Sequence, residues 1–265
     1  MATPRNHSVM RAFALLRAFE SPLEWVSSSE LSRRAKLPVP SGYRLLQTLE
    51  AIGAVVRDSR RLYRPGSLML SFTDQVTMAS LLRDVSHPQM TLLARSLGLT
   101  IHLGILEYGM VTYLAKVSSP GAFPVHTKVG AQLEPYCSGL GKVLLASLPD
   151  REVENFIMDG ELIALTPNTI RTGAALRAEI IKVREQGYAL DDREHHANMR
   201  CLAVPVRDQK GFTVAALSAT DDAERMTQER QAEIRTALLE AAASLQQLLY
   251  PQSWPVRRRP GRAES

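Results

Sequence analysis

The segment from Ser28 to Gly66 constrains the fold of this chain more than any other. A first helix is expected over Glu30–Ala35, with the serine at 28 or 29 as its N-cap, because a serine oxygen accepts a free helix N–H. Residues 36–38 break this helix. A second helix is expected from Pro40 to Ile52, since proline fits the first turn and Gly53 suits the C-terminal end.

Two short strands are expected after these helices. Val55–Asp58 and Arg61–Arg64 flank a turn at residues 59–60, and Trp25–Val26 is a candidate third strand that pairs with this ribbon. Two helices joined by a tight turn and followed by a ribbon are typical of a winged helix-turn-helix, whose second helix enters the major groove of DNA.

The second helix has an apolar face made by Leu45, Leu49 and Ile52, and most of its polar side chains lie off that face. Arg44 and Gln47 share one face and have the hydrogen-bonding groups that read guanine and adenine edges. The candidate DNA contacts are Ser41, Tyr43, Arg44, Gln47 and Thr48 on this helix, Arg33 before it, and Arg57, Arg60 and Arg61 on the ribbon, where Arg64 adds a fourth cation. The alternative is a solvated helical hairpin with ordinary surface charge.

The charge is concentrated in the first quarter of the chain. Residues 1–75 contain 11 Lys and Arg against 6 Asp and Glu, whereas residues 76–250 contain 17 against 20. A basic head on a mildly acidic body fits polyanion binding by the head alone. No apolar run reaches membrane-spanning length, charges interrupt any signal-peptide core, and Cys137 and Cys201 show no metal-ligand spacing, so a reduced, cytoplasmic protein is expected.

The chain divides into four predicted regions. These are a DNA-binding domain at 1–70, linker helices at 71–97, an effector domain at 98–250 and a disordered basic tail at 251–265. A helix from Ser8 to Glu20 should pack its Val9, Phe13, Leu16 and Phe19 face under the two central helices. In the linker, Pro88 should divide one helix into two. Its apolar surface favours dimerisation, with packing on the second domain as the alternative.

The second domain is predicted to be α+β. Strands are expected at 99–106, 110–117, 200–207 and 212–219, with a third-strand candidate at 122–129. Helices are expected at 138–147, 150–158, 172–186 and 227–249, with Asp150 and Thr172 as caps and Gly187 as a stop.

Several stretches, in this order, resemble the IclR family of bacterial transcription regulators over about residues 7 to 250. They are RLLQTLEAIGAVVR at 44–57, LGLTIHLGILEYGMVTYLAKVSS at 97–119, SGLGKVLLASLP at 138–149 and GYALDDREHHANMRCLAVPVRD at 187–208, followed by AALSAT at 215–220. The resemblance implies a winged helix-turn-helix, a linker helix and a GAF-like effector domain. It also implies a homodimer or tetramer on a palindromic operator in double-stranded DNA, and a small organic acid as effector, aromatic or aliphatic, from a catabolic pathway.

The resemblance further implies the effector contacts. These are Gly139 and Leu140 at a helix start, where backbone N–H groups can hold a carboxylate, and the polar positions Asp191, Cys201, Ser218 and Thr220. Asp191 would accept a hydrogen bond from an effector hydroxyl or be protonated. The start of the second helix, Val39-Pro40-Ser41 followed by Gly42, departs from the Lys-Ser-Thr-like start that is usual in the family. A glycine inside a helix costs roughly 1 kcal/mol relative to alanine.

Two other functions would use side chains of the second domain. Cys201 with His195 or His196, or Cys137 with His126, would be a nucleophile and base in an enzyme, but a buried cysteine is commoner. A metal-binding sensor would use the loop from Asp191 to Cys201, whose Asp192, Glu194 and histidines are ligand types for zinc; a solvated polar loop is the simpler interpretation. We expect no cofactor, no metal and no catalysis.

Overall fold

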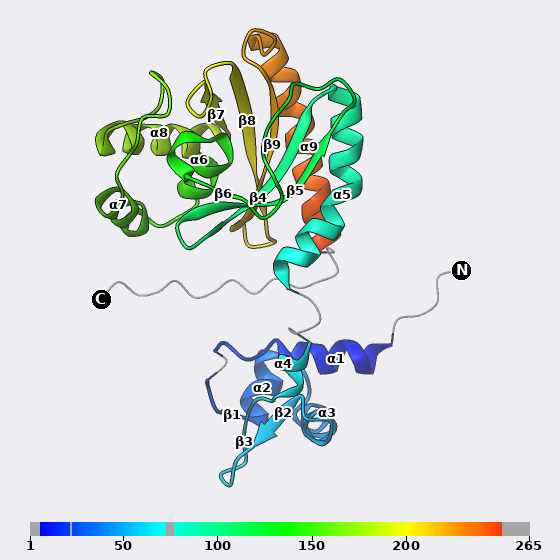
Figure 1. Ribbon diagram of the computed structural model, residues 1–265. Coiled ribbons are helices and arrows are strands. Elements are labelled where there is room, and N and C mark those ends of the chain that lie inside the picture. Colours follow the sequence, from blue (N-terminus) through cyan, green and yellow to red (C-terminus); the bar gives the residue numbers. More distant parts are fainter. Residues whose placement is uncertain (1–5, 22, 73–76, 251–265) are drawn as a thin grey trace. The chain divides into compact units, whose positions relative to one another are not determined.

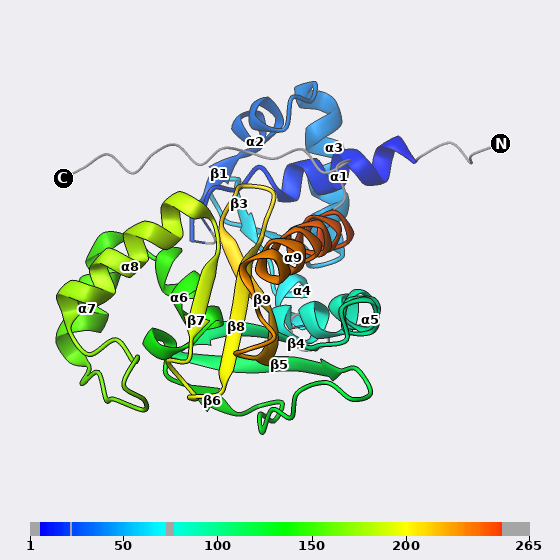
Figure 2. The same cartoon turned by 90° about the horizontal axis from the view of Figure 1, so that it is seen from above.

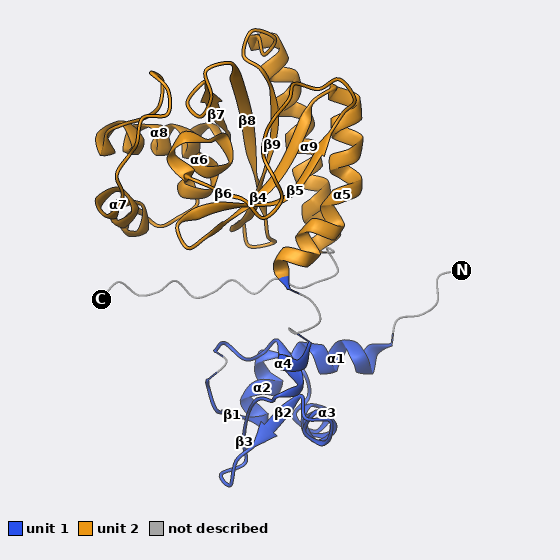
Figure 3. Cartoon of the chain, in the orientation of Figure 1, with its two compact units in different colours: residues 1–77 blue, residues 78–265 orange. Residues whose placement is uncertain are grey.

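The computed structural model describes residues 6–21, 23–72 and 77–250, and the chain forms two compact units, 1–77 and 78–265 (Figure 3). The predicted basic tail at 251–265 lies outside the described residues. Each unit has its own apolar core and is described separately.

The first unit is a winged helix-turn-helix, as the sequence predicted. Its elements are α1 (His7–Leu16), β1 (Val26–Ser27), α2 (Ser28–Arg34), α3 (Val39–Ala51), β2 (Val55–Arg57), β3 (Leu62–Pro65) and α4 (Leu68–Ser71). The three strands form an antiparallel sheet in the order β1-β3-β2, so the predicted pairing of residue 26 with the ribbon is confirmed (Figure 1).

Helices α2 and α3 approach so closely that only glycine fits at their contact. A Cβ on Gly42 would lie 2.0 Å from the Oγ of Ser32, which is itself committed to a 2.6 Å hydrogen bond with the carbonyl of Ser28. The expected helix penalty of Gly42 is therefore offset by packing. The N-cap of α2 is Ser27, one residue before the predicted caps, and its oxygen accepts from Glu30 N.

Two predicted apolar faces in the first unit are wrong in detail. Helix α3 buries Leu46 and Leu49, whereas Ile52 is 56% exposed because the helix ends one residue earlier. Helix α1 ends at Leu16 rather than at residue 20, so its buried contacts come from Leu15 and the chain just after it. Phe13, a residue of the predicted face, is 52% exposed.

The second unit is a six-stranded antiparallel sheet with helices on both faces (Figures 1 and 2). Its strands are β4 (Thr100–Glu107), β5 (Met110–Ser118), β6 (Gln132–Leu133), β7 (Ala189–Asp192), β8 (Met199–Arg207) and β9 (Thr213–Asp222). Its helices are α5 (Met78–Leu97), the 3-10 helix η1 (Pro135–Cys137), α6 (Gly139–Ala146), α7 (Asp150–Asp159), α8 (Gly173–Gln186) and α9 (Gln228–Leu249). The strand order is β6-β5-β4-β9-β8-β7.

The two faces of this sheet carry different side chains. Alternate residues such as Leu103, Val204 and Leu217 pack with α5 and α9 in the larger apolar core. The other set of alternate residues faces α6, and we call this side the α6 face. Near α6 it is apolar, with Ala203 and Ala216 in a second cluster, but toward one end of the central strands it becomes polar.

Most local signals in this unit were predicted correctly. Thr172 caps α8, and Gly187 ends it with a φ of 79°. The N-cap of α7 is Pro149 rather than Asp150, which is the first residue of the helix.

Helix α5 is continuous through Pro88, so the predicted break is wrong. Proline removes one backbone donor, but Leu82, Met90 and Leu93 on either side are buried in the core, which holds the helix together. One side of α5 thus packs on its own unit, which is the alternative to dimerisation. Leu92 is 62% exposed on α5, and dimerisation stays a prediction.

Residues 122–129 do not form the predicted third strand. They form a loop, and the third strand of this region is β6. Pro124 cannot donate a ladder hydrogen bond, and Lys116 Nζ binds the carbonyls of Val125 and Thr127 at 2.5 and 3.1 Å. The loop is therefore held by a side chain of β5 instead of by strand pairing.

Candidate functional site

Helix α3 presents the predicted DNA-reading side chains to solvent. Tyr43, Arg44, Gln47 and Thr48 are exposed and Ser41 is half-buried. Gln47 Nε2 donates to Tyr43 Oη at 3.4 Å, and Thr48 Oγ1 donates to the Arg44 carbonyl at 3.2 Å. The Arg44 guanidinium makes no ion pair with any residue that the structure describes.

The other predicted DNA contacts differ in how far they are already engaged. Arg33 is exposed but paired with Glu30, through Nε and Nη2 at 2.7 and 2.6 Å. Arg60 pairs with Asp58 at 3.0 Å in the turn of the wing. Arg57 lies 6.0 Å from the centre of a tyrosine ring, and Arg61 is exposed with a φ of 63°.

The polar part of the α6 face is a row that crosses the sheet. In strand register, Asp191 lies opposite Cys201, Cys201 opposite Thr220, and Thr220 opposite Thr100. Ser218 is two residues along β9 and lies opposite His102. All are buried. The structure therefore brings together the four predicted effector contacts from β7, β8 and β9.

The start of α6 lies against this row. A Cβ on Gly139 would be 3.0 Å from the carbonyl of Cys201 and 3.5 Å from its sulfur. Ser138 caps the helix by accepting from Gly141 N at 3.1 Å, and the first intrahelical bond runs from Lys142 N. The amides of Gly139 and Leu140 precede that bond, so they have no intrahelical acceptor. The side chain of Leu140 belongs to the apolar cluster instead.

The Asp191 carboxylate is half satisfied. Its Oδ1 accepts from Glu194 N at 2.7 Å and His195 N at 3.4 Å, while Oδ2 has no hydrogen-bond partner among the described residues. Burial raises the pKa of Asp191 to about 7. Burial likewise raises the pKa of the Cys201 thiol to about 11. Around pH 7 the Cys201 thiol is therefore neutral and Asp191 is partly protonated, with one carboxylate oxygen that accepts no hydrogen bond from a described residue.

Two family models match the chain, one for each unit. A model of the IclR helix-turn-helix domain matches residues 8–59, and one described as bacterial transcriptional regulator IclR C-terminal matches residues 75–247. The chain belongs to the IclR family. It is therefore a DNA-binding transcriptional regulator with an effector domain, and not an enzyme, as the sequence predicted.

Relatives agree over nearly the whole length. The chain is 32% identical to the HTH-type transcriptional regulator KdgR of Escherichia coli K12 over 244 residues, covering 89% of each chain. It is 30% identical to XynR of the same organism over 250 residues, covering 94% of this chain and 99% of XynR. The crystal structure of the Thermotoga maritima IclR aligns with a TM-score of 0.62 at 29% identity, covering 91% and 98%.

One further solved relative was crystallised with a ligand. An IclR homologue from Microbacterium hydrocarbonoxydans, in complex with 4-hydroxybenzoate, aligns with a TM-score of 0.59 at 24% identity, covering 90% of this chain and 98% of that one. At this identity the likeness shows the IclR fold alone.

Sequence reasoning missed several polar residues of the α6 face. His102 is buried, its Nε2 lies 2.6 Å from Thr127 Oγ1, and burial lowers its pKa to about 3, so it is neutral. Alternation along β4, with Thr100, His102 and Gly104 on one side and aliphatic residues on the other, is the signal that would have found it. Lys142 was also missed, because its partners are far away in sequence.

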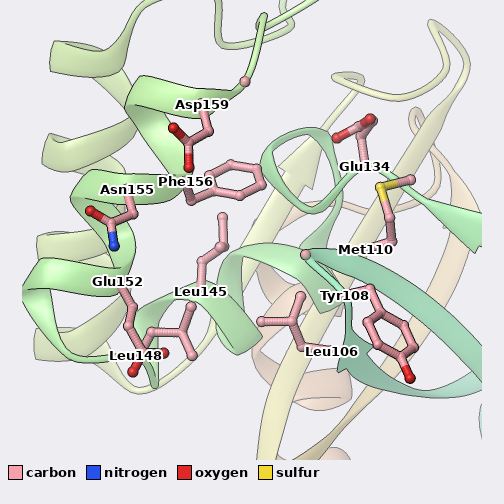
Figure 4. A pocket seen from close by; sticks show the side chains of 12 residues that line it. Leu106, Tyr108, Met110, Glu134, Leu145, Leu148, Glu152, Asn155, Phe156 and Asp159 are labelled. Atoms are coloured by element: carbon pink, nitrogen blue, oxygen red, sulfur yellow. The ribbon is translucent and has the colours of Figure 1, made fainter.

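An open cavity of about 630 Å³ lies elsewhere in the second unit, near the β4–β5 turn (Figure 4). Leu106, Tyr108 and Met110 line one side, and Glu152 and Phe156 of α7 line the other. It contains none of the predicted effector contacts. Among the described residues that line it, Glu134, Glu152 and Asp159 are acidic and none is basic, which makes it a poor receptor for an organic anion.

The described residues do not favour the cysteine-dependent enzyme or the metal-binding sensor. Burial raises the pKa of both cysteine thiols, to about 12 for Cys137 and about 11 for Cys201, away from the thiolate form. Within the described ranges, no three His, Cys, Asp or Glu side chains are grouped to hold a metal ion. In the loop from Asp191 to Cys201, Asp192 instead pairs with Arg200 at 2.6 Å.

No helix among the described residues is both long and apolar enough to cross a bilayer.

Proposed function

We propose that this regulator binds a palindromic operator as a homodimer or tetramer and changes its grip when a small organic acid occupies the α6 face. The acid would be an aromatic or aliphatic intermediate of a catabolic pathway whose operon the protein controls. Because its partner is chromosomal DNA, the protein would act in the cytoplasm.

The observation that supports this proposal most is the buried polar row beside the start of α6. The amides of Gly139 and Leu140 would receive the carboxylate, since helix N-termini favour anions. Ser218, Thr220 and Cys201 would add donors from the strands. Asp191 Oδ2, which lacks a partner among the described residues, would accept from a hydroxyl of the effector.

The charge state of the row also suits an anion. With a pKa of about 7 for Asp191, a large share of molecules hold that carboxyl neutral near pH 7, so repulsion of a carboxylate is reduced. The ligand of the Microbacterium hydrocarbonoxydans homologue, 4-hydroxybenzoate, combines a carboxylate with a hydroxyl. That combination matches the donors and the acceptor proposed here.

On DNA, α3 would lie in the major groove with Arg44 and Gln47 at base edges, while Ser41, Tyr43 and Thr48 would contact the backbone. The wing arginines, of which Arg61 is the least engaged, would contact phosphates. Two-fold related heads would require an operator with two-fold symmetry. A coupling of about 1–3 kcal/mol between effector and DNA, 5–150-fold in affinity, would suffice for regulation.

A gel-shift titration tests this function. Purified protein should retard its own promoter region at low salt, and a panel of aromatic and aliphatic acids should contain at least one that changes the midpoint. Ser218→Ala should leave DNA affinity unchanged and shift the effector dose curve by about 5-fold, which corresponds to one hydrogen bond of about 1 kcal/mol. Ser86→Ala, buried on α5 away from the row, is the control. An unaltered dose curve for Ser218→Ala would count against the site.

A further inference from the structure

Lys142 is a fully buried lysine at the fourth residue of α6, and it makes three polar contacts. Its Nζ donates to the carbonyl of Leu190 at 2.5 Å, to Glu194 Oε1 at 2.5 Å and to Glu179 Oε1 at 2.9 Å. These partners belong to β7, to the turn that follows it and to α8. One ammonium group therefore ties α6 to three separate parts of the second unit.

Two of these contacts flank Asp191. Leu190 is the residue immediately before it, and Glu194 is the residue whose backbone N–H donates to Asp191 Oδ1 at 2.7 Å. Lys142 thus holds both sides of the turn that presents the free Oδ2. On its own helix, Lys142 is about one turn beyond Gly139, where an added Cβ would lie 3.0 Å from the carbonyl oxygen of Cys201.

We infer that Lys142 is a positioning residue of the effector site: it fixes the carboxylate of Asp191 relative to the N-terminus of α6, and so sets the spacing between hydroxyl acceptor and carboxylate receptor. This inference rests on the proposed function. Lys142 touches no effector in this arrangement and acts only through Asp191.

The electrostatics of the cluster favour positioning over stability. Burial alone would lower the pKa of Lys142, but the attraction of Glu194 and Glu179 outweighs burial and raises it, so the ammonium stays charged. Ion pairs in such buried places often stabilise a fold no better than apolar side chains of similar volume, because desolvation offsets the attraction. A directional contact to a carbonyl and two carboxylates does, however, fix geometry in a way that an apolar side chain cannot.

Two further hydrogen bonds, from the loop that precedes α8, hold the same turn. Thr169 Oγ1 donates to the Glu194 carbonyl and Thr166 Oγ1 to the Arg193 carbonyl, both at 2.6 Å. The backbone after Asp191 is therefore held from the loop that precedes α8 as well. Removing Lys142 should therefore loosen the turn where Lys142 holds it, while the hydrogen bonds from Thr166 and Thr169 keep the turn folded.

The test compares two double variants of the full-length protein. Lys142→Met/Glu194→Gln replaces a buried ion pair by uncharged side chains of similar size, which avoids leaving the buried Glu194 carboxylate without its partner. Glu179, which also loses Lys142, keeps its 3.7 Å contact with Lys182. Arg177→Met/Glu154→Gln is the matched control, since that pair joins two elements of the same unit, α8 and α7, with a 2.6 Å contact away from Asp191. Thermal unfolding establishes that both variants fold.

The first readout needs no effector. Hydrogen–deuterium exchange of peptides covering residues 190–200 should be at least 10-fold faster in Lys142→Met/Glu194→Gln, with the peptides of α9 unchanged. The control should exchange like the wild type in this region. Unchanged exchange at 190–200 in a folded Lys142 variant would overturn the inference, whatever the effector is.

The second readout is selectivity, measured by titration calorimetry with 4-hydroxybenzoate and benzoate. The wild type should prefer the hydroxylated acid, and the Lys142 variant should lose at least 5-fold of that preference, whereas a merely structural role would weaken both acids equally. Equal weakening, or an unchanged ratio, would overturn the inference. If the wild type binds neither acid nor any other of the gel-shift panel, the proposed effector site is wrong, and the exchange result alone decides whether Lys142 positions the turn.

Discussion

The two units of this regulator place their polar side chains in opposite environments. In the first unit the polar side chains proposed to contact DNA stand on the exposed side of α3, above a core cluster of apolar side chains. In the second unit the polar side chains proposed to contact the effector are buried on the α6 face, in register across neighbouring strands. In the function proposed above, the first surface is covered by a large polyanion, and the second encloses a small molecule.

This difference has energetic consequences. An exposed side chain costs little to the fold when it is removed, so its loss should be felt in binding alone. A buried polar group is held by its partners, and changing it affects folding and binding together. Variants of the two units should therefore differ in whether they change the free energy of unfolding or binding alone.

The largest effect is expected from the pH dependence of Asp191. Its carboxyl has a pKa of about 7 in the folded protein and 3.8 as the ordinary value. Because the folded state binds this proton more tightly, the group's contribution to stability is fully present below about pH 4 and is lost as pH rises toward 7. Asp191→Asn cannot lose it, so the stability of the variant relative to the wild type should rise by roughly 3 kcal/mol between about pH 4 and pH 7.

Denaturant unfolding at several pH values measures this gain. Asp84→Asn, which changes an exposed carboxylate on α5, is the control and should follow the wild type. If the difference between Asp191→Asn and the wild type were constant across this range, the carboxylate would not be isolated from solvent, and the contrast between the units would lose its main support.

A smaller effect is expected from Gly42→Ala in the first unit, which should lower the free energy of unfolding by about 2 kcal/mol. The new Cβ would lie 2.0 Å from Ser32 Oγ, and the cost of overpacking exceeds the roughly 1 kcal/mol that alanine gains in helix propensity. Fluorescence of Trp25 in a Trp254→Phe background reports unfolding of this unit, since the chain has 2 tryptophans.

The partner substitution isolates the contact. Ser32→Gly removes both atoms nearest to the new Cβ, so Gly42→Ala/Ser32→Gly should be more stable than the sum of the two single effects, by about 1 kcal/mol. A stabilising Gly42→Ala would mean that α2 and α3 lie further apart than described.

Much of the first unit was predictable because its signals are local. Breaks at Pro38 and Gly53 and the periodicity between them fix two helices and a turn from neighbouring residues alone. Which helix face is buried was less predictable. Leu45 and Leu46 are adjacent and both apolar, and only the packing of α2 and α1 decides that Leu46 is the fully buried one.

The α6 face was hard to predict because its contacts join distant residues. Lys142 bonds to Leu190 and Glu194, which are 48 and 52 residues away, and nothing near Lys142 in sequence indicates these partners. The pairing of β4 with β9 likewise places His102 beside Ser218. The family resemblance supplied Asp191, Cys201, Ser218 and Thr220, whereas alternation along β4 supplies Thr100 and His102 only once the order of the strands is known.

Pro88 shows the limit of a local rule in the other direction. Proline disfavours helix at the preceding residue, yet α5 runs through it. Burial of the side chains of Leu82, Met90 and Leu93 stabilises the fold by about 1.5–3 kcal/mol for each side chain. The sum exceeds the roughly 3 kcal/mol that a proline inside a helix costs. Tertiary packing therefore overrides the break.

The smallest effect among these variants is expected for the exposed surface. Arg44→Ala should weaken operator binding by about 1–2 kcal/mol, as for an arginine that reads a base edge, and should relax the preference at one base pair in each half-site. Thermal stability should not change, because the side chain is exposed and pairs with no described carboxylate. Arg207→Ala, which changes an exposed arginine of the second unit, should leave both operator affinity and thermal stability unchanged.

Salt-dependent gel shifts separate base reading from phosphate contact: a lost phosphate contact lowers the slope of log affinity against log salt concentration by about 1 and affects all sequences equally. If Arg44→Ala behaves that way, α3 lies across the backbone rather than in the groove. If instead it lowers the unfolding free energy, the polar surface of the first unit is part of its core after all, and the two units are not opposites.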